Sequence, residues 1–233
     1  MSNNIPNISA VIAAAGESSR MNLDTGESKQ FINIGGKPVI ERTLEIFNAS
    51  PYICEIIISA RVCDIDRIAE IAKAFDKVKI KDITAGGSTR AESVAGAAGR
   101  ASCEYIAIHD GARCFVRLED IAGVALRAYE TGAAAAGCKL TDTIKRVENG
   151  VITDTLERGS LYAVQTPQVF LRKNYLHALN HIIKSEPGES GGLNAPDDCY
   201  IMERAGYSVS VVECSRYNIK LTDGQDLEFF NLS

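Results

Sequence analysis

Short apolar runs alternate with helical patterns along most of the chain, and this alternation constrains the fold more than any other feature. The apolar runs occupy residues 8–14, 54–60, 77–83, 104–109, 133–138 and 208–214. Runs of this length and composition are typical of strands buried on both faces of a sheet. Helical patterns occupy residues 38–48, 64–75, 88–101, 118–131, 171–185 and about 198–205. This order predicts an α/β fold, a Rossmann-like, mostly parallel sheet with helices on both faces.

Several helix ends carry their own signals. Pro38 suits the first helical position, and Asp64 and Ser88 suit the start of the next two helices. Gly132 follows the pattern at 118–131 and predicts its C-terminal end.

One segment departs from the alternation. Residues 141–159 place two short alternating runs around Asn149–Gly150, a pair that strongly favours a two-residue hairpin turn. We therefore expect a single domain over residues 1–233, with a projecting β-arm inserted at 141–163. A second irregular segment, at 186–198, is rich in proline and glycine and predicts a loop.

Composition excludes several classes of protein. The net charge is −5, with no tryptophan and no long basic block, so we expect no nucleic-acid partner. No apolar run approaches the roughly 20 residues needed to span a bilayer, and we expect no membrane partner. The seven cysteines form an odd set without a C-x-x-C pair, which is typical of free thiols. The first residues lack a signal-peptide pattern, so we expect a cytoplasmic protein.

The first strand leads into a candidate anion site. Small residues at 13–16 allow a ligand to approach the backbone N–H groups, and Arg20 and Lys29 follow in "GESSRM" and "SKQF". Loop amides and two cations could hold a polyphosphate, although a tight turn with solvated charges would give the same pattern.

Other nucleotide and catalytic motifs do not fit. The chain has neither a P-loop nor a G-x-G-x-x-G fingerprint. Ser190 in "GESGG" matches G-x-S-x-G only in letters, because Pro187 precedes it where a strand is required. His177 and His181 lie four residues apart, but no third zinc ligand lies nearby in the sequence.

A glycine pair opens the second constellation, "GGSTRAES" at residues 86–93. Ser88, Arg90 and Ser93 would lie near a helix N-terminus, where free N–H groups favour an anion or a base edge. The alternative is that Ser88 is only a helix cap.

The third constellation is "IAIHDGARCFV" at residues 106–116. Asp110 ends a buried strand, and an aspartate there beside a phosphate site suits Mg²⁺, because Mg²⁺ takes few protein oxygens and shares the rest with phosphates and water. His109 is more typical of a residue that holds loops by hydrogen bonds.

A fourth group lies late in the chain, at Thr143, Arg158, Thr166 and Lys220. Each is an ordinary surface residue type. Arg158 and Lys220 double the number of cations available, which would suit a second anionic substrate.

These motifs resemble one family in their order. "AAAGESSRM", "SKQF", "GGSTRAESV", "HDGAR", "DTIKR", "QTPQVF" and "NIKLT" are similar to the pattern of the 2-C-methyl-D-erythritol 4-phosphate cytidylyltransferases. The resemblance covers about residues 8–228. It implies transfer of CMP from CTP to the sugar phosphate with release of pyrophosphate, in non-mevalonate isoprenoid biosynthesis, with Mg²⁺ as cofactor.

The resemblance also implies roles for single residues. Arg20 and Lys29 resemble the pair that stabilises charge on the α-phosphate, and Arg158 and Lys220 the pair that places the attacking phosphate. Asp110 resembles the metal ligand. The CTP site would comprise Ala14, Ala15, Gly16, Gly87, Ser88, Arg90, Ser93 and Ala112, and the polyol phosphate site Arg113, Thr143 and Thr166. The arm would interlock a homodimer, so that Thr143 or Arg158 could serve the neighbour's site.

Two positions depart from the family pattern. Pro196 stands where a threonine is expected, and Tyr217 stands where an acidic residue usually precedes "NIK". Both belong to the polyol side of the site. A ribitol-5-phosphate cytidylyltransferase therefore remains an alternative, and a non-catalytic nucleotide-binding module is another.

Overall fold

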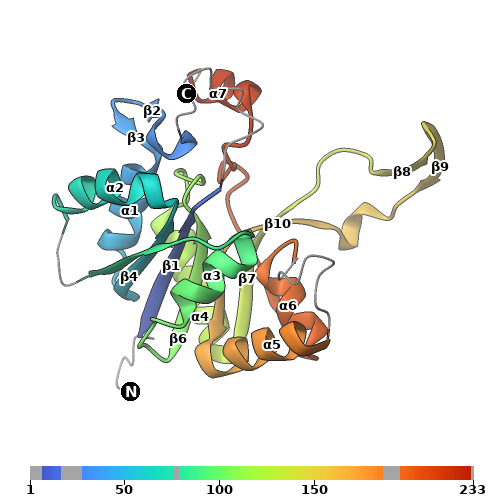
Figure 1. Cartoon of the computed structure of the whole chain (residues 1–233). Coiled ribbons are helices and arrows are strands. Elements are labelled where there is room, and N and C mark those ends of the chain that lie inside the picture. Colours follow the sequence, from blue (N-terminus) through green and yellow to red (C-terminus); the bar gives the residue numbers. More distant parts are fainter. Residues whose placement is uncertain (1–6, 17–27, 76–78, 186–194, 232–233) are drawn as a thin grey trace.

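The computed structural model describes residues 7–16, 28–75, 79–185 and 195–231 (Figure 1). Its centre is a seven-stranded sheet in the order β11-β7-β10-β6-β1-β4-β5. The strands are β1 (Ile8–Ala14), β4 (Ile53–Ala60), β5 (Ile80–Ala85), β6 (Tyr105–Asp110), β7 (Ala133–Lys139), β10 (Tyr162–Leu171) and β11 (Ser210–Glu213). All neighbouring pairs are parallel except those of β10, which runs antiparallel to β6 and β7. The predicted mostly parallel sheet is confirmed.

Helices cover both faces of this sheet, as the sequence predicts. On one face pack α1 (Val39–Ala49), α2 (Ile65–Ala72) and α4 (Leu118–Thr131), and on the other α3 (Arg90–Ala98), α5 (Arg172–Ser185) and α6 (Asp198–Arg204). Strand β1 shows why both faces need cover: Ile8, Ala10 and Ile12 pack into the first layer, and Val11 packs into the second. Within the described residues, no helix has both the length and the apolarity to cross a membrane.

The sequence patterns did not predict strand β10, a small hairpin of β2 (Asn33–Ile34) and β3 (Lys37–Pro38), or helix α7 (Gly224–Asn231). In β10, Pro167 and the polar Gln165 and Gln168 interrupt the apolar run that would predict a strand. The ladder with β7 also breaks between Val164 and Gln168, which frees this part of β10 for other contacts.

Three predicted helix starts need correction. Helix α3 is capped by Thr89, whose side chain accepts the Glu92 N–H, because the Ser88 hydroxyl and N–H donate to the Glu92 carboxylate instead. Pro38 is the N-cap of α1 and not its first residue. Asp64 makes no side-chain cap for α2, since its carboxylate pairs with Arg61. The predicted end of α4 is confirmed, with Gly132 at a φ of 83°.

The predicted arm has the expected hairpin. Strands β8 (Lys145–Glu148) and β9 (Val151–Thr155) pair antiparallel across Asn149 and Gly150, which have φ angles of 50° and 79°. Both angles match the tight turn that Asn-Gly favours. The arm projects away from the sheet (Figure 1), and the side chains of both its strands are exposed.

Candidate active site

The carboxyl ends of β1, β4 and β6 meet at one edge of the sheet, where parallel α/β folds commonly bind ligands. Two cavities lie at this edge. The larger cavity, of about 560 Å³, is bordered by residues that include Gly16, Lys29, Arg61 and Gly87. The smaller cavity, of about 390 Å³, is bordered by residues that include Arg113, Thr166 and Glu203. Arg90, Asp110 and Lys220 border both cavities and form what we call the junction.

Small residues shape the wall of the larger cavity. A Cβ on Gly86 would lie only 2.3 Å from the Cβ of Ala15, so only glycine allows the two loops to lie this close. Ser93 fixes the glycine pair: its hydroxyl accepts the Gly87 N–H at 3.0 Å and donates to the Thr89 carbonyl at 2.8 Å.

Asp110 is the centre of the junction. Its Oδ1 accepts from Arg90 Nε at 3.0 Å, and its Oδ2 accepts from Lys220 Nζ at 2.9 Å and from Arg113 Nε at 3.4 Å. Burial alone would raise the pKa of this carboxyl, but Arg90, Lys220 and Arg113 hold the pKa far below its ordinary value. Three cations thus converge on one ionised carboxylate, which leaves an excess of positive charge.

Thr166 and His109 fix the backbone of Asp110. The Asp110 N–H donates to Thr166 Oγ1 at 3.1 Å, and Thr166 Oγ1 lies 3.0 Å from His109 Nδ1. His109 Nε2 lies 3.1 Å from the Arg113 carbonyl. Burial lowers the pKa of His109 to about 4, so the ring is neutral near pH 7. A neutral ring with its proton on Nε2 satisfies both contacts, since Thr166 then donates to Nδ1. His109 is the loop-holding residue that its sequence context indicated.

Two more cations border the larger cavity. Lys29 lies in a 3-10 turn (Lys29–Phe31), where its Nζ donates to the Leu221 carbonyl at 2.9 Å. Arg61 holds the Asp64 carboxylate with Nε at 2.6 Å and a second nitrogen at 3.0 Å. The sequence reading missed Arg61, although its position directly after the predicted strand at 54–60 could have identified it.

Most predicted site residues gather at these cavities. The larger cavity takes Ala15, Gly16, Lys29, Gly87, Ser88, Arg90, Ser93, Asp110, Ala112 and Lys220, and the smaller cavity Arg113 and Thr166. The Ala14 side chain instead packs into the core, so Ala14 could offer only its backbone. Arg20 lies outside the described residues, as does most of the predicted loop at 186–198. Residues that the sequence did not indicate include Gln30, Thr89, Thr222, Gln165, Gln168, Asp197 and Glu203.

Two predicted residues lie on the exposed arm and border neither cavity of this chain. Thr143 precedes β8, and Arg158 lies in a 3-10 turn (Arg158–Ser160) after β9 and donates to the Thr141 carbonyl.

The two departures from the expected pattern lie in different surroundings. Pro196 borders the smaller cavity. Tyr217 is 55% exposed and borders neither cavity, and the Arg117 guanidinium lies 6.0 Å from its ring. The next residue, Asn218, is buried and donates to the Thr166 carbonyl at 2.7 Å.

Known proteins resemble this chain over almost its whole length. Residues 8–231 match the 2-C-methyl-D-erythritol 4-phosphate cytidylyltransferase family. Enzymes of that name from Halalkalibacterium halodurans and Clostridium acetobutylicum are 39% and 40% identical over 222 and 221 residues, which cover 95% and 94% of this chain and 94% and 93% of theirs. The crystal structure of 4-diphosphocytidyl-2C-methyl-D-erythritol synthase from Anaerococcus prevotii matches with a TM-score of 0.84 at 28% identity, covering 97% of this chain and 95% of that one. The chain therefore belongs to the 2-C-methyl-D-erythritol 4-phosphate cytidylyltransferase family of nucleotidyltransferases.

Proposed function

We propose that this chain transfers CMP from CTP to 2-C-methyl-D-erythritol 4-phosphate. An oxygen of the acceptor phosphate forms a bond to the α-phosphorus of CTP. The bond from that phosphorus to the bridging oxygen breaks, and its electron pair leaves with pyrophosphate. The observation that carries this proposal is the junction, because two anionic substrates in neighbouring cavities would meet beside the same Arg90 and Lys220.

The charges of the two cavities suit these substrates. Four cations, Lys29, Arg61, Arg90 and Lys220, border the larger cavity, whereas Asp110 is its only acidic residue in the part of the chain that the structure describes. This excess suits a triphosphate. Away from the junction, the smaller cavity has Asp197, Glu203, Gln165 and Gln168 on its border, and such oxygens and amides suit the hydroxyl groups of a polyol.

The reaction needs alignment and charge neutralisation rather than a covalent intermediate. A phosphate monoester is already a competent nucleophile, and charge develops on the α-phosphate and the leaving pyrophosphate. Fixed cations at the junction stabilise that charge without reorganising during the reaction.

We assign Mg²⁺ to Asp110 as cofactor. Groups of three or more potential metal ligands do not occur among the described residues, so a single carboxylate would supply the protein oxygen. Such a donor fits Mg²⁺, which commonly takes its other ligands from phosphates and water. When bound, the ion would neutralise charge on the triphosphate. Because Asp110 already holds three cations, we expect Mg²⁺ to bind with CTP and to displace one of them.

We further propose that the chain acts as a homodimer joined through the arm. Val147, Val151 and Ile152 expose 55%, 65% and 61% of their surface there, which favours a covered interface. Arg158 and Thr143 would then reach the partner's smaller cavity. The cytoplasm suits this enzyme, because all seven thiols are unpaired.

The proposal is tested by pyrophosphate release from CTP and Mg²⁺ with either of two acceptors. We expect release with 2-C-methyl-D-erythritol 4-phosphate and little with ribitol 5-phosphate. Release with ribitol 5-phosphate alone would assign the acceptor differently and keep the CTP site. A chain that binds CTP but releases no pyrophosphate with either acceptor would contradict transfer and favour a binding module.

A further inference from the structure

Arg90 holds a special position, since it borders both cavities and is the first residue of α3. Its Nε donates to Asp110 at 3.0 Å, and one terminal nitrogen donates to Asp198 Oδ2 at 2.8 Å. A guanidinium has five N–H groups, and these two contacts leave others for an anion at the junction. Two carboxylates therefore fix the plane of an arginine that both substrates would meet.

Of these carboxylates, Asp198 is the more deeply held. Its side chain is fully buried, and its Oδ1 accepts from the Tyr175 hydroxyl at 2.6 Å. The Asp198 N–H donates to Gln168 Oε1 at 3.1 Å, which ties the start of α6 to β10. Tyr175 is itself buried and stacks on Phe170, with 5.4 Å between ring centroids. Asp198 and the Tyr175 that anchors it are thus fixed within the packed core.

Asp110 and Asp198 differ in what a substrate would do to them. Asp110 borders both cavities, so an incoming phosphate would compete with it for its cations, and Mg²⁺ would compete with those cations for Asp110. Asp198 borders neither cavity, and its ion pair with Arg90 would persist. A buried carboxylate without a cation is costly, which holds Arg90 to Asp198 throughout the reaction.

We propose that Asp198 is a positioning residue for the transfer reaction: anchored by Tyr175, it holds the Arg90 guanidinium at the junction of the two cavities. This role rests on the proposed function. Asp198 touches neither substrate and acts only through Arg90.

The first experiment is a double-mutant cycle on the full chain, with Asp198→Asn, Arg90→Ala and the double variant. Asparagine keeps the size of the side chain but removes the charge that holds the guanidinium. We expect Asp198→Asn to lower kcat between about tenfold and a hundredfold, as for other misplaced binding groups, with a smaller change in the KM for CTP. In the Arg90→Ala background, Asp198→Asn should lower kcat less than about twofold, because the guanidinium that Asp198 holds is absent.

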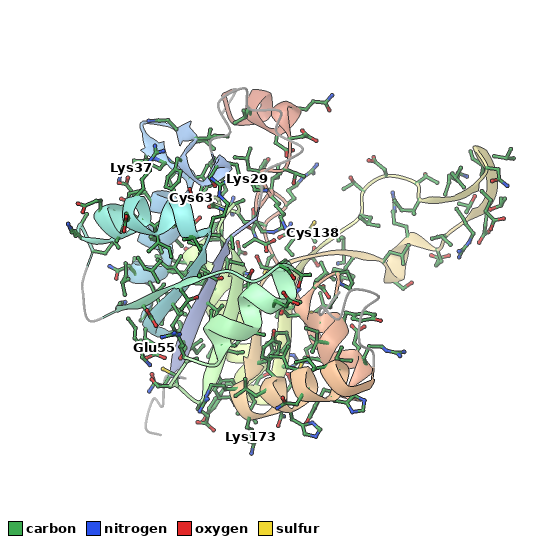
Figure 2. The ribbon with its side chains drawn as sticks, viewed as in Figure 1. Lys29, Lys37, Glu55, Cys63, Cys138 and Lys173 are labelled. Carbon is green, nitrogen blue, oxygen red and sulfur yellow. The ribbon has the colours of Figure 1, made fainter. Side chains whose placement is uncertain are left out.

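Glu55→Gln is the matched control. Glu55 is also a buried carboxylate, which accepts from Ser9 Oγ at 2.6 Å and Ser102 Oγ at 2.7 Å and pairs with Lys81. It lies near the amino ends of the strands, at the opposite end of the sheet from Lys29 (Figure 2). We expect Glu55→Gln to lower the free energy of unfolding and to leave kcat unchanged.

Equal kcat values for wild type and folded Asp198→Asn, or additive losses in the cycle, would overturn the positioning role. If Asp198→Asn does not fold, Tyr175→Phe removes only the hydroxyl that anchors Asp198, and it should lower kcat in the same direction by a smaller factor. An unchanged kcat in folded Tyr175→Phe would then count against the role. An inactive wild-type chain would contradict the proposed function itself, and the role of Asp198 would fall with it.

Discussion

At the residue scale, the carboxylate of Asp110 binds three cations of the site. Asp110 holds Arg90, Arg113 and Lys220 at the edge of the sheet, and each of these cations is a phosphate ligand by chemistry. Without that carboxylate the three cations would repel one another. We expect Asp110 to hold them together until a triphosphate binds these cations and Mg²⁺ binds Asp110.

Lys29 tests the charge of the larger cavity. Lys29→Ala should lower kcat about 10² to 10³-fold, as expected for a fixed cation that stabilises developing charge. The side chain of Lys29 is largely buried beside the cavity, so the loss should exceed that of a surface lysine. We predict an effect of the same size for Arg20→Ala.

Lys173→Ala is the control for charge alone. Lys173 is exposed on α5 and lies at the opposite end of the molecule from Lys29 (Figure 2). Steady-state kinetics of both purified variants provide the measurement. An unchanged kcat in folded Lys29→Ala would remove Lys29 from the catalytic residues.

His109 should make stability depend on pH. Its pKa falls from 6.5 to about 4 on folding, so between these values the unfolded chain binds a proton that the folded chain does not. Stability is therefore full above pH 6.5 and falls as the pH drops toward 4, by about 3 kcal/mol over the whole window. Urea unfolding at several pH values between about 7.5 and 5.5 measures this slope, because there the carboxyls of Asp110 and Glu55 are almost fully ionised in the folded and the unfolded chain alike.

His109→Asn should flatten the slope within that window. It would also lower stability at pH 7, because the contacts of the ring with Thr166 and the Arg113 carbonyl are lost. A wild-type slope that persists unchanged in His109→Asn would assign the effect to another group.

At the element scale, the strand ends and their loops make the site, and sequence periodicity predicts them well. The runs at 8–14, 54–60 and 104–109 correspond closely to β1, β4 and β6. Parallel order then brings Gly16, Arg61 and Asp110 to one edge, so much of the larger cavity follows from the pattern. The smaller cavity does not, because it depends on β10, a strand that Pro167 and its polar residues conceal in the sequence, and on Tyr200 and Glu203 of α6, which only tertiary packing brings to this cavity.

Substitution of Gly86 tests the close approach of its loop to the loop that holds Ala15. Gly86→Ala would place a Cβ 2.3 Å from the Ala15 Cβ and 2.9 Å from Ser93 Oγ, so the loops must separate. We expect a loss of about 1–3 kcal/mol in unfolding free energy, typical of overpacking, together with weaker CTP binding by calorimetry.

Gly96→Ala is the control, in the helix that follows this loop. Gly96 is exposed in α3, and a Cβ there would meet nothing within 4 Å. Alanine should therefore stabilise the chain by about 0.5–1 kcal/mol and leave CTP binding unchanged. Equal CTP affinities in Gly86→Ala and wild type would contradict a nucleotide in the larger cavity.

At the scale of the whole molecule, the arm decides whether one chain is enough. Arg158 and Thr143 border neither cavity of their own chain, so their predicted roles require a second chain. We expect Arg158→Ala and Lys220→Ala each to be nearly inactive alone. Mixed after dissociation, they should regain about a quarter of wild-type activity, because half of the dimers are mixed and each has one intact site.

Each variant kept separate through the same dissociation step is the control. A mixture that stays as inactive as the separate variants, while co-purification through a tag on one variant shows mixed dimers, would place Arg158 in its own chain's site or outside catalysis.

The most direct test of the account is the structure of the chain with a non-hydrolysable CTP analogue, Mg²⁺ and the polyol phosphate. We expect the triphosphate in the larger cavity and the acceptor in the smaller one. The α-phosphate and the acceptor phosphate should both lie within hydrogen-bond distance of the junction cations Arg90 and Lys220. A triphosphate or an acceptor phosphate bound away from these two side chains would contradict the transfer geometry proposed for this chain.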